Sequence, residues 1–157
     1  DVYKRQGSEH GWNSFGLEYT SKPQRLFTWS GSFRYGGYYA NGTRLNIGGT
    51  AGYRFQPYVS LSVTTNYNRI ALPPPWNTVR FLLVSPRLDV TMTNKFFVTA
   101  FAQYNQQTSN VNLNMRLQWR YRPASDLFIV YTDNYDSDTF FVRNRAVVLK
   151  WTYWWNL

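Results

Sequence analysis

The sequence predicts an all-β fold, an antiparallel up-and-down transmembrane β-barrel that is incomplete and contributes about nine strands. Three observations lead to this prediction. Aromatic residues make up 20% of the chain, yet the mean hydropathy is negative, at −0.48. Apolar and polar residues alternate with a period of two, and no window shows sustained helical periodicity. The apolar run at residues 81–84 is far shorter than the roughly 20 residues of a membrane-spanning helix.

The predicted strands follow from this alternation, which short turn-forming segments interrupt. The clearest example is residues 110–122, where Val111, Leu113 and Leu117 alternate with Asn112 and Arg116. Segments 96–107 and 127–133 are ambiguous because they carry apolar residues on both faces. The predicted strands are residues 13–20, 27–38, 43–55, 58–69, 78–93, 96–107, 110–122, 127–133 and 145–157.

Each connection can be assigned to the periplasmic or the external side if the C-terminal end of the last strand lies on the periplasmic side. Barrels combine short periplasmic turns with longer external loops. The expected periplasmic turns are 21–26, 56–57, 94–95 and 123–126, and the expected external loops are 39–42, 70–77, 108–109 and 134–144.

The C-terminal segment has one wholly apolar face, which resembles the terminal-strand signal that the barrel-assembly machinery recognises. The predicted insertion signal is Trp151, Tyr153, Trp155 and Leu157. Aromatic residues at strand ends also predict a girdle at the membrane interface. The predicted girdle consists of Tyr19, Tyr53, Trp119, Tyr121, Trp151, Tyr153 and Trp155.

The formal net charge of +9 comes mostly from arginine. An arginine facing lipid near the membrane midplane would cost about 2–4 kcal/mol, so the basic residues of the strands are expected to face the lumen. Such a lumen favours anions, or else its arginines brace the wall through partners such as Glu18 and Asp89. Nucleic acid is not an expected partner, because the basic residues are spread over many strands. The predicted lumen-facing residues are Arg34, Arg44, Arg54, Arg80, Arg116, Arg120, Arg122 and Lys150.

Residues for catalysis or metal binding do not form a recognisable constellation. There is no cysteine, and His10 is the one histidine, so a triad or a histidine metal cluster cannot be assembled from this segment. Asp133, Asp136 and Asp138 supply oxygen ligands suitable for Ca²⁺, although a solvated acidic loop is the favoured interpretation. We therefore expect a protein that is not an enzyme and that has no cofactor and no metal.

The first six residues, Asp-Val-Tyr-Lys-Arg-Gln, resemble the translated adapter of transposon-based sequencing libraries. They are therefore expected to lie outside the fold, with residues 7–157 forming the C-terminal portion of an outer-membrane barrel domain.

The stretch Arg-Tyr-Arg-Pro-Ala-Ser-Asp-Leu-Phe-Ile-Val-Tyr-Thr-Asp at residues 120–133, followed by Asn-Arg-Ala-Val-Val-Leu-Lys-Trp-Thr-Tyr at 144–153, carries a family resemblance. It resembles the C-terminal end of Gram-negative surface proteins that combine an N-terminal carbohydrate-binding module, similar to family 9, with an outer-membrane barrel domain of unknown function. The resemblance implies a larger barrel and a sugar-binding module upstream. It supplies no catalytic residues.

The expected function is therefore a non-catalytic barrel segment in the bacterial outer membrane that embeds or anchors a surface or periplasmic protein that binds glycans. Its expected partners are outer-membrane lipid, the barrel-assembly machinery and glycans bound by an upstream module. One alternative is a passive pore with a basic lumen that favours anions. Another is a soluble β-barrel or sandwich that binds an apolar ligand.

Overall fold

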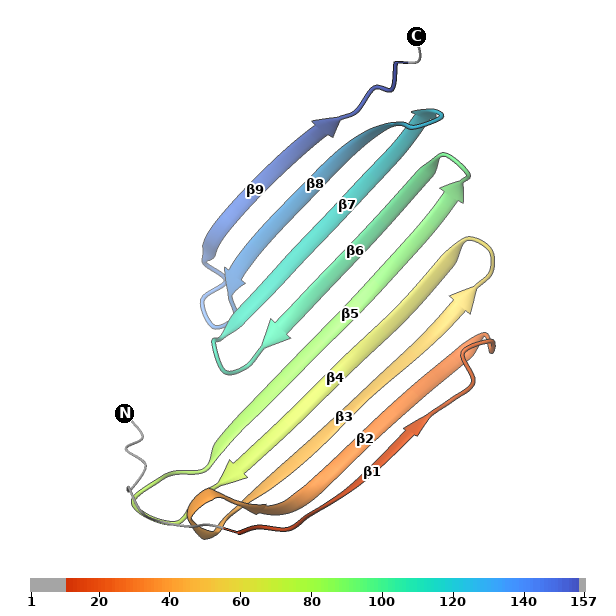
Figure 1. The fold of residues 1–157 in the computed structure, drawn as a ribbon. Coiled ribbons are helices and arrows are strands. Elements are labelled where there is room, and N and C mark those ends of the chain that lie inside the picture. Colours follow the sequence, from red (N-terminus) through yellow and green to blue (C-terminus); the bar gives the residue numbers. More distant parts are fainter. Residues whose placement is uncertain (1–10, 156–157) are drawn as a thin grey trace.

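The computed structural model describes residues 11–155, which form one antiparallel sheet of nine strands. Every strand pairs with its neighbour in sequence, so the spatial order is β1 to β9 (Figure 1). No helix in residues 11–155 is long and apolar enough to cross a membrane. The elements are β1 (Ser14–Thr20), β2 (Phe27–Tyr38), the short 3₁₀ turn η1 (Tyr39–Asn41), β3 (Gly42–Phe55), β4 (Val59–Ala71), β5 (Val79–Thr93), β6 (Phe96–Asn105), β7 (Asn110–Arg122), β8 (Ser125–Asp136) and β9 (Val142–Trp151).

The predicted all-β, antiparallel up-and-down arrangement is thus confirmed, and the sheet is open. Strands β1 and β9 lie at opposite edges and do not pair with each other within the described part of the chain (Figure 1). An open sheet of this kind agrees with the expectation of an incomplete barrel. The proposed adapter, residues 1–6, lies outside the described residues.

Two strands near the C-terminal end differ from their predicted bounds. Strand β8 is longer than predicted, because Asn134 pairs with both Asn112 and Asn144, and this extension leaves residues 137–141 as the β8–β9 connection. Strand β9 is shorter and ends at Trp151, because its partner β8 begins only at Ser125. Beyond that point hydrogen bonds still hold the chain against the start of β8: the Thr152 amide donates to the Asp126 carbonyl and the Trp154 amide to the Ser125 hydroxyl.

Cross-strand register separates the sheet into an apolar face and a polar face. On the apolar face Leu17 pairs with Phe33, which in turn pairs with Ile47. On the polar face Thr50 pairs with both Ser30 and Thr64. Antiparallel partners share a face, so the period-two pattern of each strand is continued across all nine strands.

The apolar face is exposed instead of forming a core. Among the described residues no hydrophobic side chain is fully buried, and Leu17, Trp119 and Trp151 are 62, 47 and 68% exposed. The accessible surface is 12023 Å², whereas a compact soluble protein of this mass exposes about 8,200 Å². The sheet alone therefore does not hide its apolar residues from solvent.

The close approach of β1 and β2 requires a glycine at position 36. A Cβ added to Gly36 would lie 2.4 Å from the Asn13 carbonyl oxygen and from the Cα of Ser14. Both are backbone atoms, so a larger side chain forces the two strands apart. At Gly31, by contrast, a Cβ meets nothing within 4 Å.

We expect Gly36→Ala to lower the free energy of unfolding by about 1–3 kcal/mol, as overpacking does. Urea titration of the protein in lipid vesicles, followed by tryptophan fluorescence, measures this change. Gly31→Ala is the matched control in the same strand and is expected to unfold like the unsubstituted protein. Equal stability of the two variants would contradict this account of the β1–β2 contact.

Candidate functional site: the polar face of the sheet

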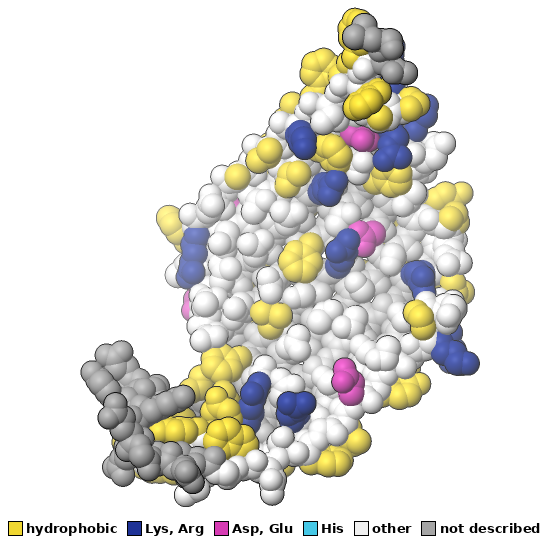
Figure 2. Space-filling model, in the orientation of Figure 1, with side chains coloured by type: hydrophobic (Ala, Val, Ile, Leu, Met, Phe, Trp, Pro, Cys, Tyr) yellow, Lys and Arg dark blue, Asp and Glu magenta, His cyan; other side chains and the backbone are white. Residues whose placement is uncertain are grey.

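The polar face is a continuous layer of short polar side chains that bond across the strands. The Asn46 amide donates to Asn68 Oδ1 at 2.5 Å, and the hydroxyls of Thr50 and Thr64 lie 3.0 Å apart. White surface, which marks polar side chains and backbone, covers most of the face shown in Figure 2, with dark blue basic groups scattered over it. This face is built for contact with water or with polar solutes.

Basic residues outnumber acidic residues on the polar face. By cross-strand register, eight basic residues and four acidic residues lie there, an excess of four positive charges. The basic residues are Arg34, Arg44, Arg54, Arg87, Arg116, Arg120, Arg122 and Lys150, and the acidic residues are Glu18, Asp89, Asp126 and Asp136.

One ion pair braces the middle of this face. Arg87 Nε and Nη2 donate to the two oxygens of Asp89 at 2.8 and 3.1 Å, and the Thr99 hydroxyl donates to Asp89 Oδ1 at 2.8 Å. The two-residue spacing of Arg87 and Asp89 puts both on one face of β5. This contact fits the bracing role expected of Asp89, with Arg87 as a partner that the sequence analysis did not name.

Other arginines of the polar face rest on phenylalanine rings. The Arg116 guanidinium carbon lies 4.8 Å from the centre of the Phe128 ring, and that of Arg120 lies 5.9 Å from the centre of Phe97. Lys150 is the direct cross-strand partner of Phe128. Arg116 forms no ion pair with a carboxylate of residues 11–155.

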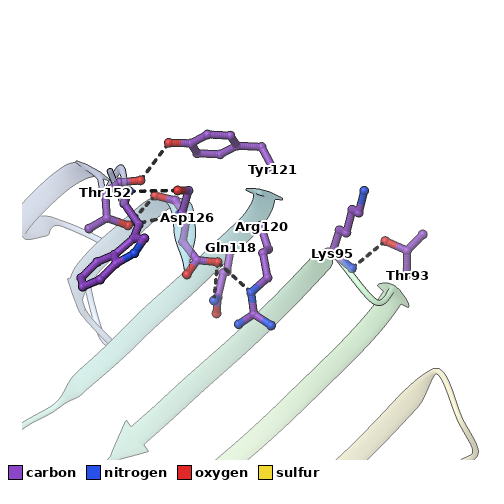
Figure 3. Close-up of polar contacts among 9 residues, drawn as sticks. Thr93, Lys95, Gln118, Arg120, Tyr121, Asp126 and Thr152 are labelled. Carbon is purple, nitrogen blue, oxygen red and sulfur yellow. Dashed lines mark hydrogen bonds and ion pairs between the residues drawn. The ribbon is translucent and has the colours of Figure 1, made fainter. Parts of the chain in front are cut away.

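A polar network joins the end of β7, the start of β8 and the end of β9, at the end of the sheet opposite the β8–β9 connection (Figure 3). Gln118 Nε2 and Arg120 Nε donate to Asp126 Oδ1 at 3.1 and 3.3 Å. Thr152 Oγ1 accepts from the Asp126 amide at 3.1 Å, and the Tyr121 hydroxyl donates to the Thr152 carbonyl at 2.8 Å. The network fixes this corner, and beside it an open groove of about 510 Å³ is lined partly by Lys95, Arg120 and Arg122.

The structure contradicts one of the predicted lumen-facing residues. Arg80 pairs with Arg69 and therefore lies on the apolar face, in the row next to Leu82. The apolar run at 81–84 does not show which residues of β5 belong to the polar face. Arg87 and Asp89 do show it, because the odd-numbered residues of this strand lie on the polar face. The other predicted basic residues share the polar face, and their position in a lumen stays a prediction.

Of the predicted girdle residues, Tyr19, Tyr53, Trp119, Tyr121 and Trp151 lie at the same end of the sheet, on the apolar face. Tyr19, Tyr53 and Trp119 pair with Gly31, Phe27 and Phe96. Trp151 Nε1 donates to the Tyr121 hydroxyl at 2.7 Å. Aromatic rings also lie near one another along the C-terminal segment: the centre of the Tyr153 ring is 6.5 Å from that of Trp151 and 6.1 Å from that of Trp155. Recognition of this segment as an insertion signal stays a prediction, and Leu157 lies outside the described residues.

A buried carboxylate on the apolar face is a site that the sequence analysis missed. Asp133 is 0% exposed, although it was expected in an external loop. Its Oδ2 accepts hydrogen bonds from the hydroxyls of Tyr131 and Tyr135, the latter at 2.5 Å, and from Arg145 Nη2 and Nε at 2.7 and 2.8 Å. Tyr-x-Asp-x-Tyr at 131–135 places these three side chains on one face, which is the signal that could have revealed the cluster.

The acidic residues Asp133 and Asp136 of β8 and Asp138 of the β8–β9 connection do not assemble as the Ca²⁺ interpretation requires. Asp133 is held in the apolar-face cluster, and Asp136 Oδ2 accepts from Arg143 at 2.5 Å. The Asp138 amide donates to Asp136 Oδ1 at 3.1 Å. No group of three potential metal ligands occurs among the described residues.

The site thus belongs to an open antiparallel sheet with one exposed apolar face and one basic polar face. No family model and no curated protein matches the chain. Among solved structures, it is similar to the KdgM porin in complex with disordered oligogalacturonate, with a TM-score of 0.45, 8% sequence identity, and coverage of 81% of this chain and 71% of that chain. A similarity at this level transfers no residue role and no ligand to this chain.

The Asp133 cluster predicts strong coupling between Asp133 and Arg145. Asp133→Leu leaves the two tyrosine hydroxyls and the guanidinium without their shared acceptor, so we expect a loss of about 1–3 kcal/mol in unfolding free energy. Arg145→Leu leaves a buried carboxylate that is only partly compensated. In the double variant the loss is expected to be smaller than the sum of the two single losses by at least about 0.5 kcal/mol. Urea unfolding of the four proteins in lipid vesicles measures these losses. A loss in the double variant equal to the sum of the two single losses would refute the coupling.

Proposed function

We propose that these nine strands form part of the wall of a bacterial outer-membrane β-barrel, with the polar face toward a water-filled lumen and the apolar face toward lipid. The observation that carries the proposal is the exposed row of large apolar side chains on a sheet whose other face is hydrogen-bonded and basic. In hydrocarbon every backbone group needs a partner. The free edges of β1 and β9 are therefore paired by further strands in the closed barrel.

The distribution of aromatic residues along the strands supports this orientation. Tryptophan and tyrosine of the apolar face gather at one end, as Trp119 and Trp151 do. Tyrosines of the same face, Tyr35, Tyr67 and Tyr104, lie toward the opposite ends of their strands. Two belts of amphipathic rings are typical of the two interfaces of a membrane.

The role that we propose for this barrel is membrane embedding without catalysis, after insertion by the barrel-assembly machinery. The resemblance of residues 120–133 and 144–153 to surface proteins with a family 9-like sugar-binding module supports an anchoring role for such a module. A lumen braced by pairs such as Arg87–Asp89 suits an anchor, because its polar groups satisfy one another.

Detergent dependence tests the membrane assignment. We expect the full-length protein to fractionate with outer membranes, to need detergent for extraction, and to migrate on gels in two forms that differ by heating, since a folded barrel resists unfolding by dodecyl sulfate. A monodisperse protein in buffer without detergent would instead support the soluble apolar-ligand binder and would refute the barrel.

A pore that favours anions is the second candidate, and the excess of four positive charges on the polar face favours it. Arginines that rest on phenylalanine rings, as Arg116 does on Phe128, keep donors free for a passing solute. Clefts lined by one sign of charge raise the local concentration of the opposite ion.

Ion selectivity in planar bilayers distinguishes the pore from the closed anchor. Under a salt gradient, we expect the full-length protein to be more permeable to chloride than to potassium. Replacing Arg116 and Arg120 by glutamine should lower this ratio, because two fixed charges are removed, whereas the lysine variants R116K and R120K should retain it. Absence of conductance, or cation preference in the unsubstituted protein, would refute the pore while leaving the barrel intact.

A further inference from the structure

Two arginines face each other on the apolar side of the sheet. Arg69 of β4 and Arg80 of β5 are direct cross-strand partners, and Arg69 also pairs with Leu45 of β3. Both arginines are exposed. They lie near the β4–β5 connection, residues 72–78, which we assign to the external side.

This juxtaposition lacks the negative charge that would balance it. Like charges directly opposite each other destabilise an antiparallel pair. Neither arginine forms an ion pair with any of residues 11–155, and the connecting segment 72–78 contains no acidic residue. The cluster at Arg145 shows the contrast, because that arginine of the same face is paired with Asp133 at 2.7 Å.

In the membrane orientation proposed above, the pair lies at the depth of lipid headgroups. The neighbouring row of the apolar face is Tyr67 with Leu82, and the rows beyond it toward the opposite end are Thr65 with Val84 and Val63 with Pro86. Tyrosine marks the interface of a membrane. The Cα atoms of the two arginines therefore lie about 7 Å along their strands beyond the tyrosine row, which is two residues of strand. Near the interface an arginine on the lipid face costs about 0–1 kcal/mol.

We propose that Arg69 and Arg80 bind a phosphate group of an anionic glycolipid in the outer leaflet, an inference that rests on the membrane function proposed above. Guanidinium groups bind phosphate through paired N–H donors and remain charged at all relevant pH values. The acyl chains of the same lipid lie along the apolar rows of Tyr67 and Leu82. Because these rows continue directly from the arginines, the site fits a phosphorylated glycolipid better than free phosphate.

Retention of lipid by the detergent-solubilised, full-length protein tests the proposal. Native mass spectrometry compares binding of bisphosphorylated lipid A with that of its dephosphorylated form. We expect the phosphorylated form to be retained about ten-fold more, a difference that the double variant R69Q/R80Q abolishes. The double variant R34Q/R44Q is the matched control, because it removes two positive charges near the same end of the sheet on the polar face.

Each outcome bears on the proposal separately from the barrel itself. Heat-modifiable migration shows that each variant is folded, and R69K/R80K keeps the charges and should retain most of the preference. Equal retention by R69Q/R80Q and the unsubstituted protein, both folded, would overturn the lipid site and leave the barrel. Loss of preference in R34Q/R44Q, or displacement of lipid A by excess inorganic phosphate, would also overturn it.

Discussion

The alternation of side chains along each strand, combined with a register that keeps one phase across the middle of the sheet, is the constraint on which the other features depend. A slip of one residue in any pair would move a whole row of side chains to the opposite face. The register irregularities lie between Thr91 and Thr93, between Arg120 and Arg122, and between Asn134 and Tyr135. All three are close to strand ends, so the middle of the sheet keeps a single phase from β1 to β9.

The sequence was sufficient to predict those elements whose alternation is chemically clear. Strands β2 and β7 have the predicted bounds, because their apolar and polar residues fall on separate faces. Strand β6 was ambiguous, since Phe97 and Phe101 lie on the polar face beside arginines: Arg120 rests over Phe97, and Arg87 is the cross-strand partner of Phe101. A phenylalanine ring on the polar face is stabilised when an arginine guanidinium lies over it. The sequence of β6 alone does not show that a neighbouring strand supplies this arginine.

The positions of individual charges were harder to predict, because each depends on a neighbouring strand. Arg80 stands before an apolar run that fits either phase of the alternation, and its pairing with Arg69 places it on the apolar face. Asp133 ended a predicted strand and was grouped with Asp136 and Asp138 as a solvated acidic loop, whereas the structure places it on the apolar face, where a carboxylate is costly when it is alone. Two tyrosines of its own strand and Arg145 of the next strand compensate it. The tyrosines were visible in the sequence, but the arginine became a partner only through the β8–β9 register.

The four charged residues of the apolar face show that the two ends of the sheet differ, which the composition does not show. Arg69, Arg80, Asp133 and Arg145 all lie in the half of their strands that we assign to the external side. The opposite half of this face carries tryptophan and tyrosine and, by register, no charge among the described strands. A soluble sheet has no reason to sort charge by strand end on its apolar face. A sheet between two different leaflets does, since charged side chains of the lipid face are tolerated only where phosphate and water are in reach.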